Sequence, residues 1–341
     1  MGSASFLKRA QALLHVRNRL LRECLAELLA VFVLILITLS GSAQMVTSSG
    51  TKGNILTSYL AGALAVMVAV YTAGGVSGAH LNPAFSLCMC LLGQLPLWKF
   101  PIFVAVQTLG SFIAAGAVYA LYYGMQKPMC TPALWGQGVH GAGVLPGSWL
   151  RMCPAPARVH WLCPADAIQF YSNGTLAASG PLETASIFAT YPAKYLSLSN
   201  GFLDQVMGTA LLIVGILAIT DTRNKGVPKG LEPVAVALLV FSIEVSMGSN
   251  CGCPMNPARD FGPRLFTYVA GWGAEVFSRD NAWWWVPVVA PLLGAAVGTA
   301  LYQLLVAFHH PAEDGGGGGA RGAKRDSSST AIPLGAGPWD K

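Results

Sequence analysis

The sequence predicts an all-α membrane protein with six transmembrane helices and two re-entrant half-helices in an inverted repeat. Three observations predict it: a scarcity of charge, six long apolar segments, and one tripeptide that occurs in each half. Of the 341 residues, 53% are hydrophobic and 11% are charged, and the mean hydropathy is +0.52. Soluble domains carry about 25% charged residues, so this deficit indicates that lipid surrounds much of the chain.

Six apolar segments each approach the ~20 residues that a spanning helix needs. Inside a bilayer every backbone polar group must be bonded within the protein, so these segments are expected to be helical. They are Leu21–Ser40, Thr57–Tyr71, Phe100–Tyr123, Phe202–Ile219, Glu232–Met247 and Trp284–Phe308.

The tripeptide Asn-Pro-Ala opens two apolar stretches that are too short to span, which run to about Leu92 and Tyr268. Asparagine is a good N-cap and proline suits the first helical position, so each tripeptide is predicted to start a half-helix. Each half of the chain holds three spans, so the second half is inverted relative to the first. The two copies are Asn82, Pro83 and Ala84, and Asn256, Pro257 and Ala258.

The basic residues predict the topology. The N-terminal arm of residues 1–20, the loop Asp221–Gly230 and the tail of residues 309–341 should be cytoplasmic, and the Gly- and Ser-rich tail should be disordered. The membrane-embedded domain then covers residues 21–308, and we expect a multi-pass protein of the plasma membrane. The loop after the third span is outside, where Asn173 begins an N-glycosylation sequon.

An atypical segment of about residues 125–165 interrupts this pattern. It is rich in Pro, Gly, Trp and Cys, and it has no periodicity. It is either an extracellular insertion or translated non-coding sequence from an erroneous gene model, and we favour the second. The eight cysteines predict neither a disulfide framework nor a metal site.

The sequence resembles the aquaporins over about residues 20–308. Ser77–Ala84 and Asn256–Arg264 are highly specific for that family, and Asp260 marks its glycerol-conducting branch, the aquaglyceroporins. The resemblance implies a homotetramer in the lipid bilayer, with one passive pore per subunit for water, glycerol and other small neutral solutes, urea among the candidates. Further stretches that resemble this branch are Gly201–Gln205, Phe266–Trp272 and Trp283–Pro287.

The two half-helices would aim the positive ends of their dipoles at the channel centre. The amide groups of Asn82 and Asn256 would donate there to a passing oxygen. This field disfavours cations and interrupts proton conduction along a file of water.

The resemblance places Arg259 at the narrowest constriction, and spacing carries over Gly62, Glu244 and Cys253 as the rest of that ring. Gly62 and Cys253 are small, so we expect a ring wide enough for a polyol. Cys253 is expected to face the pore and react with mercurials. Glu244 departs from the family, which has a small residue or a histidine there. Either it lowers the flux or makes it pH-dependent, or it turns to the outer vestibule and stays hydrated.

Glu27 lies inside the first span, and the resemblance implies that it accepts hydrogen bonds from the loop of the first tripeptide. His80 lies two residues before Asn82, near the expected cytoplasmic vestibule, and histidine titrates near neutral pH. A proton-sensitive gate formed by Glu27 and His80 is therefore a second hypothesis beside the scaffold role.

The sequence favours a channel over an enzyme, because it has no phosphate-binding loop and no nucleophile-and-base constellation. No cofactor, metal or nucleic-acid partner is expected. Two alternatives stay open: a secondary transporter with the same inverted repeat, and a poorly conducting relative whose pore Glu244 has altered.

Overall fold

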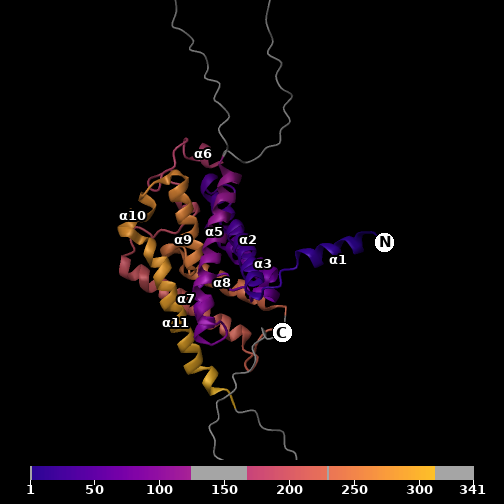
Figure 1. Cartoon of the computed structure of the whole chain (residues 1–341). Helices are drawn as coiled ribbons and strands as arrows, with labels where there is room; N and C mark the ends of the chain where they lie inside the picture. The colour runs from indigo at the N-terminus through magenta and orange to yellow at the C-terminus, as the bar shows by residue number, and fades with distance from the viewer. Residues whose placement is uncertain (1, 124–166, 229, 312–341) are drawn as a thin grey trace, which may run out of the picture.

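The computed structural model describes residues 2–123, 167–228 and 230–311, and this part of the chain is helical without strands. Figure 1 shows the long helices gathered into one bundle. The α-helices are α1 (Gly2–Leu14), α2 (Arg19–Thr47), α3 (Ile55–Ser77), α4 (Pro83–Leu91), α5 (Phe100–Tyr122), α6 (Ala167–Tyr171), α7 (Leu198–Thr220), α8 (Glu232–Cys251), α9 (Pro257–Thr267), α10 (Glu275–Ala282) and α11 (Val286–Leu305). The short helical turns are η1 (Leu97–Lys99), η2 (Ala185–Ile187), η3 (Tyr268–Trp272), η4 (Trp283–Trp285) and η5 (Ala307–His309).

Six helices in the described ranges are long and apolar enough to cross a membrane, and they coincide with the six predicted segments. Most extend beyond their apolar runs because polar caps complete their ends. Asn54 caps α3 in a reciprocal capping box with Thr57, and Gly78 ends the same helix in the left-handed conformation. Asn18 and Ser197 cap α2 and α7 with their side chains in a similar way.

The packing of the helices confirms the inverted repeat. In the first half α2 packs along α3 and α5, and in the second half α7 packs along α8 and α11. Across the halves, α3 lies against α8, while each half-helix packs on the third span of the opposite half, α4 on α11 and α9 on α5.

Glycines let these helices approach closely. A Cβ on Gly294 of α11 would lie 2.5 Å from the carbonyl oxygen of Val206 in α7. A Cβ on Gly262 of α9 would lie 2.7 Å from the carbonyl oxygen of Thr108 in α5. Both separations are too short for any side chain, so each contact needs glycine, as is common between membrane helices.

The outward faces of the bundle are apolar. On α3, Leu60, Leu64 and Val68 repeat every four residues on one side of the helix and are about 40% exposed, at 43%, 44% and 39%. Such a face suits contact with lipid or with a neighbouring subunit.

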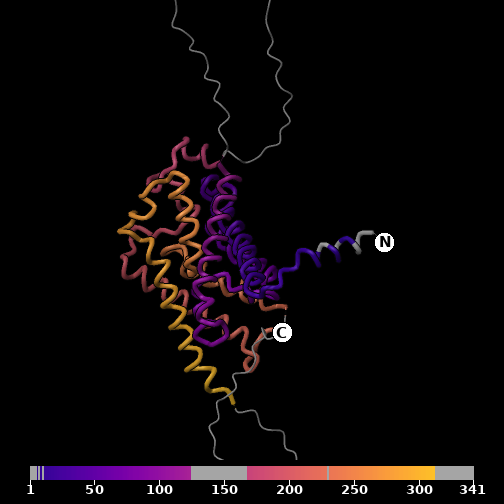
Figure 2. The backbone as a smooth tube through the Cα atoms, in the orientation of Figure 1, coloured from indigo at the N-terminus to yellow at the C-terminus, as the bar shows by residue number. Residues whose placement is uncertain are grey.

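The N-terminal arm holds α1, which projects away from the bundle in Figures 1 and 2. The atypical segment of residues 125–165, with Cys130, Cys153 and Cys163, lies outside the described residues. Residues 312–341 of the predicted disordered tail also lie outside them.

Candidate pore and constriction

The two Asn-Pro-Ala tripeptides begin the two half-helices, as the sequence predicts. The side-chain oxygen of Asn82 accepts from the N–H of Ala84 at 2.8 Å, which caps α4. The side-chain oxygen of Asn256 accepts from Ala258 and Arg259 at 3.1 and 3.2 Å, which caps α9. The half-helices contact each other, so their N-termini meet inside the bundle.

The asparagine amides also join the two halves of the protein. Nδ2 of Asn82 donates to the carbonyl of Met255, and Nδ2 of Asn256 donates to the carbonyl of Leu81, both at 2.9 Å. Each amide keeps a second N–H, and the two asparagines are 7% and 9% exposed. One donor of each amide therefore joins the two loops, and one further N–H remains on each side chain.

The loops before the two half-helices share one backbone pattern. Each preceding span ends at a left-handed glycine, four residues before the asparagine. The residues three and one before the asparagine also have positive φ, which costs roughly 1–2 kcal/mol each in a residue with a Cβ. They are Ala79 (47°) and Leu81 (59°) in the first loop and Cys253 (44°) and Met255 (42°) in the second.

A buried side chain holds each strained loop in place. The carboxylate of Glu27, which is fully buried in α2, accepts from the backbone N–H groups of His80 at 2.7 Å and Leu81 at 2.8 Å. In the second half, Oε1 of Gln205 in α7 accepts from the N–H of Met255 at 3.2 Å. Gln205 thus has the position that Glu27 has in the first half, and sequence reasoning missed it.

Glu27 is saturated by donors. Besides the two loop amides it accepts from Ser77 Oγ at 2.7 Å and from Gln107 Nε2 at 2.8 Å. The imidazole of His80 does not bond to it in the described structure. His80 Nδ1 instead lies 3.1 Å from Ser86 Oγ, and the ring packs between Phe85 and Phe103. The Glu27–His80 contact therefore runs through the backbone of the histidine.

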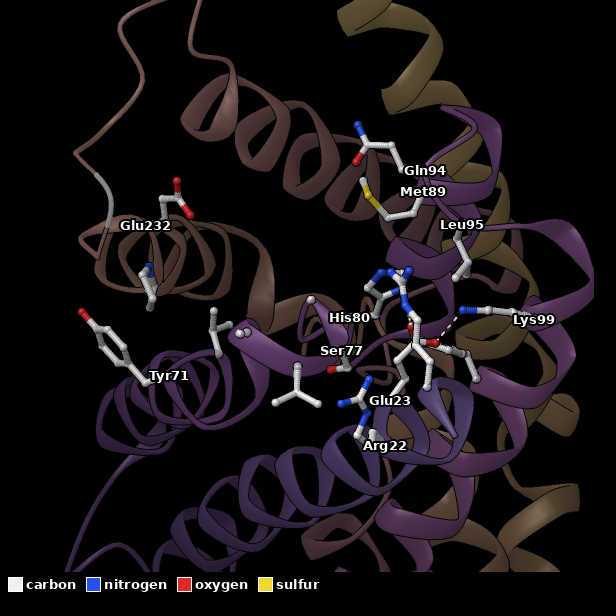
Figure 3. Close-up of a pocket in the computed structure, with 18 of the residues that line it drawn as sticks. Arg22, Glu23, Tyr71, Ser77, His80, Met89, Gln94, Leu95, Lys99 and Glu232 are labelled. Atoms are coloured by element: carbon white, nitrogen blue, oxygen red, sulfur yellow. Dashed lines mark hydrogen bonds and ion pairs between the residues drawn. The ribbon is translucent and has the colours of Figure 1, made fainter. Parts of the chain in front are cut away.

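A cavity of about 1180 Å³ with a mixed polar and apolar lining opens at one end of the bundle, and His80 lies in its wall. The start of α2, the end of α3, the residues before α5 and the start of α8 surround it, so these ends lie on one side of the protein. Figure 3 shows Glu23 and Lys99 beside the histidine, joined by a dashed line. Nζ of Lys99 and Oε2 of Glu23 are 2.6 Å apart. We call this cavity the inner vestibule.

A second polar cluster lies near the N-terminal end of α7, around Asp204. It was not predicted from the sequence. The buried carboxylate of Asp204 accepts from Asn250 Nδ2 at 2.6 Å and lies 3.0 Å from both Gln205 Nε2 and Cys251 Sγ. These contacts tie α7 to the end of α8 and hold Gln205 in place. Asn250 and Cys251 are 46 and 47 residues from Asp204 in the chain, so only the fold brings these two to it.

Arg259 follows the second tripeptide and is partly exposed inside the bundle. Its Nη1 donates to the carbonyl oxygen of Phe188 at 3.0 Å. Thr190 follows Phe188 by two residues in the same loop. Both its backbone N–H and its hydroxyl donate to Oδ2 of Asp260. Asp260 therefore holds the loop that positions the guanidinium of Arg259, in line with the structural role expected for it.

Asp260 belongs to a fully buried ion pair with Arg264, in which Nη2 and Oδ1 are 2.8 Å apart. The guanidinium of Arg264 and that of Arg279 both lie over the ring of Tyr191, at 4.6 and 4.1 Å from its centroid. Burial raises the pKa of Tyr191 to about 12, so the ring stays neutral and available to both cations.

Glu244 of α8 lies against Gly62 of α3, and Cys253 packs on the carbonyl of Ile243, the neighbour of Glu244. The expected width of the ring stays a prediction. A Cβ on Gly62 would lie 3.2 Å from Oε1 of Glu244, so the glutamate fills the space that the glycine leaves. The expected reaction of Cys253 with mercurials stays a prediction. This residue is 4% exposed, and its sulfur packs 3.8 Å from the carbonyl of Ile243 in α8.

The sequence model of the major intrinsic protein family matches residues 15–302 of the chain. Human Aquaporin-10 is 54% identical over 323 residues, which cover 95% of this chain and 93% of the relative. Human Aquaporin-9 is 42% identical over 296 residues, which cover 87% and 86%.

Among solved structures, the X-ray structure of the aquaglyceroporin from Plasmodium falciparum superposes with a TM-score of 0.64. It is 26% identical and covers 84% of this chain and 97% of its own. Its helical fold agrees with the arrangement of spans and half-helices described above.

Proposed function

Since the chain belongs to the major intrinsic protein family and is a passive membrane channel for water and glycerol rather than an enzyme, we propose a route for these solutes along the two half-helices. A solute enters at the inner vestibule, passes His80, meets the free amide N–H groups of Asn82 and Asn256, and leaves past Arg259. The similarity to Aquaporin-10 and Aquaporin-9 does not favour the alternative of a poorly conducting protein whose pore Glu244 has altered.

One observation carries this proposal. The two asparagines hold each other's loops with one N–H each, which leaves two donors fixed at the meeting point of two half-helix N-termini. Positive dipole ends and fixed donors favour an oxygen acceptor and oppose a cation. A neutral solute with hydroxyl groups replaces its hydrogen bonds to water by hydrogen bonds to these donors. It carries no charge that would lose its hydration shell, as a cation would.

Arg259 supplies the second barrier to cations in the proposed route. A charged side chain at membrane depth is costly unless it lines a wet path or is paired. Arg259 makes no ion pair within 4.0 Å in the described structure, and one of its donors is bound to Phe188. Its remaining N–H groups are left to bind solute hydroxyls.

We also propose the membrane, the topology, the oligomeric state and one further permeant. We place the protein in the plasma membrane with both termini in the cytoplasm, so the inner vestibule faces the cytoplasm. The apolar outer faces of helices such as α3 would then meet lipid or the other subunits of a homotetramer. Urea, a small neutral solute with donors and an acceptor, is proposed as a further permeant.

We also propose N-glycosylation at Asn173. In the described structure Asn173 is exposed at a turn with φ of 51°, followed by Gly174, so its side chain is reachable by an enzyme. Expression in a glycosylating cell should give a band that shifts on treatment with an endoglycosidase. Asn173→Gln should remove the shift, and a shift that persists in this variant would contradict the assignment.

A flux measurement distinguishes the channel from a secondary transporter. Initial glycerol uptake into proteoliposomes should rise linearly with the glycerol gradient and should not depend on sodium or proton gradients. Uptake that saturates and requires an ion gradient would overturn the channel in favour of a transporter with the same repeat.

A further inference from the structure

The N-terminal helix α1 stands apart from the rest of the molecule. Its far end lies clear of the bundle in Figure 1, and no other element of the described ranges packs closely on it. A single helix of 13 residues is marginally stable in water unless one of its faces is covered. At about 1.5 Å per residue it is ~20 Å long, too short to cross a hydrocarbon core of ~30 Å. α1 therefore needs a partner for one face, and it is not a span.

One face of α1 is apolar. Phe6, Leu13 and Leu14 are separated by seven and eight residues, a spacing that places them on the same side of a helix. Residues 7 and 10 are also apolar in the sequence and have the matching spacing. The side chains of Phe6, Leu13 and Leu14 are 71%, 85% and 78% exposed, so the described structure leaves this apolar stripe uncovered.

The other side of α1 and the residues that follow it are basic. Residues 1–22 contain no Asp or Glu, and their Lys and Arg residues are Lys8, Arg9, Arg17, Arg19 and Arg22. Within the described ranges only Arg19 among them forms an ion pair, with Glu23 of α2. The exposed Lys8 and Arg9 lie off the apolar stripe. An apolar stripe bordered by unpaired cations suits a partner that is apolar inside and anionic at its surface.

The place of α1 in the chain brings it to the surface of the bilayer. Residues 15–18 alone separate it from α2, and four residues reach about 14 Å at most. On α2, Leu21, Leu25 and Leu29 recur every four residues and are 49%, 48% and 54% exposed, so the lipid-facing side of this span begins at Leu21. α1 is thus tethered at the level where the hydrocarbon core begins.

We propose that α1 binds a bilayer surface that contains anionic phospholipids, with its apolar stripe at the acyl-chain boundary and Lys8 and Arg9 on the lipid headgroups. The cytoplasmic leaflet carries such lipids, so this inference rests on the cytoplasmic position of the N-terminal arm in the proposed function. Bound in this way, α1 anchors the start of α2. That start supplies Arg19, Arg22 and Glu23 to the wall of the inner vestibule.

Hydrogen–deuterium exchange of the full-length protein in lipid nanodiscs tests this proposal. Exchange of the α1 amides should be at least about fivefold slower in phosphatidylcholine discs with ~30% phosphatidylserine than in discs of phosphatidylcholine alone, since one basic residue near an anionic surface is worth about that factor. Lys8→Gln with Arg9→Gln should lose most of this difference. Arg223→Gln with Lys225→Gln removes two exposed cations from the loop after α7 and should keep it.

A second pair of substitutions tests the apolar stripe. Phe6→Ala with Leu13→Ala removes apolar area and keeps a good helix former, so α1 should exchange faster in both kinds of disc. Equal exchange of the wild type in both discs would overturn the proposal. Slow exchange that does not change when Lys8 and Arg9 are replaced would also overturn it, because it would indicate an apolar contact with another subunit.

These outcomes are separate from those of the proposed function. A nanodisc exposes both faces of the bilayer, so the exchange of α1 depends neither on conduction nor on the side that the arm occupies in a cell. A wild type that conducts neither water nor glycerol would contradict the proposed function and leave the lipid contact of α1 standing.

Discussion

Asn82 and Asn256 hold each other's loops: the amide of each donates at 2.9 Å to the carbonyl of the residue that precedes the other. The two residues are 174 positions apart, and this pair of bonds joins the two halves of the inverted repeat at its centre. Each asparagine thus caps a half-helix and bonds to the other loop. In the proposed route its remaining N–H donates to the solute.

Asn82→Asp separates these roles. The aspartate keeps the oxygen that caps α4 at Ala84, but it loses the donor to Met255 and the donor to the solute. We expect both water and glycerol permeability to fall at least about fivefold, since one hydrogen bond is worth about 1 kcal/mol. Stopped-flow light scattering measures this, and a thermal melt checks that the fold survives. Unchanged permeability at normal expression would contradict the role of this amide.

His80→Ala tests the proposed gate. The imidazole is wedged between Phe85 and Phe103 in the wall of the inner vestibule, so its removal should widen the entrance. If His80 is the gate, the response of glycerol flux to acid should disappear in the variant. Ser86→Ala serves as the comparison, because it removes the hydroxyl beside Nδ1 and keeps the ring. An acid response that is unchanged in His80→Ala would defeat the gate.

Alanine variants of Arg264 and Arg279 compare how much a fully buried and a partly exposed guanidinium contribute to the free energy of unfolding. Both guanidinium groups lie on Tyr191, but Arg264 is fully buried against Asp260 whereas Arg279 is 21% exposed in its side chain. Arg264→Ala leaves a buried charge unpaired and should cost about 3–5 kcal/mol of unfolding free energy. Arg279→Ala loses partly buried ion pairs, a hydrogen bond to the carbonyl of Ala178 and the contact with Tyr191 but leaves no fully buried charge unpaired, so it should cost less, about 1–2 kcal/mol. Detergent-solubilised thermal melts should show the difference, and equal losses would be inconsistent with it.

Asp221 gives a pH dependence of stability. Partial burial raises the pKa of its carboxyl, but hydrogen bonds from the N–H of Arg223, from His310 and from Tyr302 outweigh this and hold the pKa below its ordinary value. Because the folded-state pKa is the lower one, the stabilisation is complete above the unfolded pKa of about 4 and is lost as pH falls through the folded pKa.

Asp221→Asn should therefore melt at a lower temperature than the wild type at pH 7. The gap between the two should begin to narrow below about pH 4 and should vanish only as the pH falls through the lower folded-state pKa, where the native carboxyl becomes protonated. Melts across pH 3 to 7 measure this, and a gap of constant size would show that the charge of Asp221 is not what stabilises the protein.

The sequence predicted the spans and the half-helices from local signals, whereas the membership of the ring came from the family resemblance and stays a prediction. Apolar length marks a span, and Asn followed by Pro marks a helix start wherever it occurs. The ends of α3 were predicted less well, because its last turn up to Ser77 is not apolar and is completed by the left-handed Gly78.

What the sequence could not show depends on distant partners. Gln205 reads as an ordinary polar residue until Met255 is placed against it, 50 residues later in the chain. The buried thiol of Cys253 and the position of Glu244 against Gly62 depend on how closely α3 and α8 pack, which no periodicity reports. A search for the counterpart of Glu27 in the second half would have found Gln205.

Stopped-flow permeability of the reconstituted wild-type protein tests the central claim most directly. Proteoliposomes should shrink in an osmotic gradient well above the rate of empty vesicles, with glycerol following water, while the proton permeability stays at the empty-vesicle level. Water and glycerol rates equal to those of empty vesicles, at verified incorporation of folded protein, would contradict a continuous path past Asn82, Asn256 and Arg259.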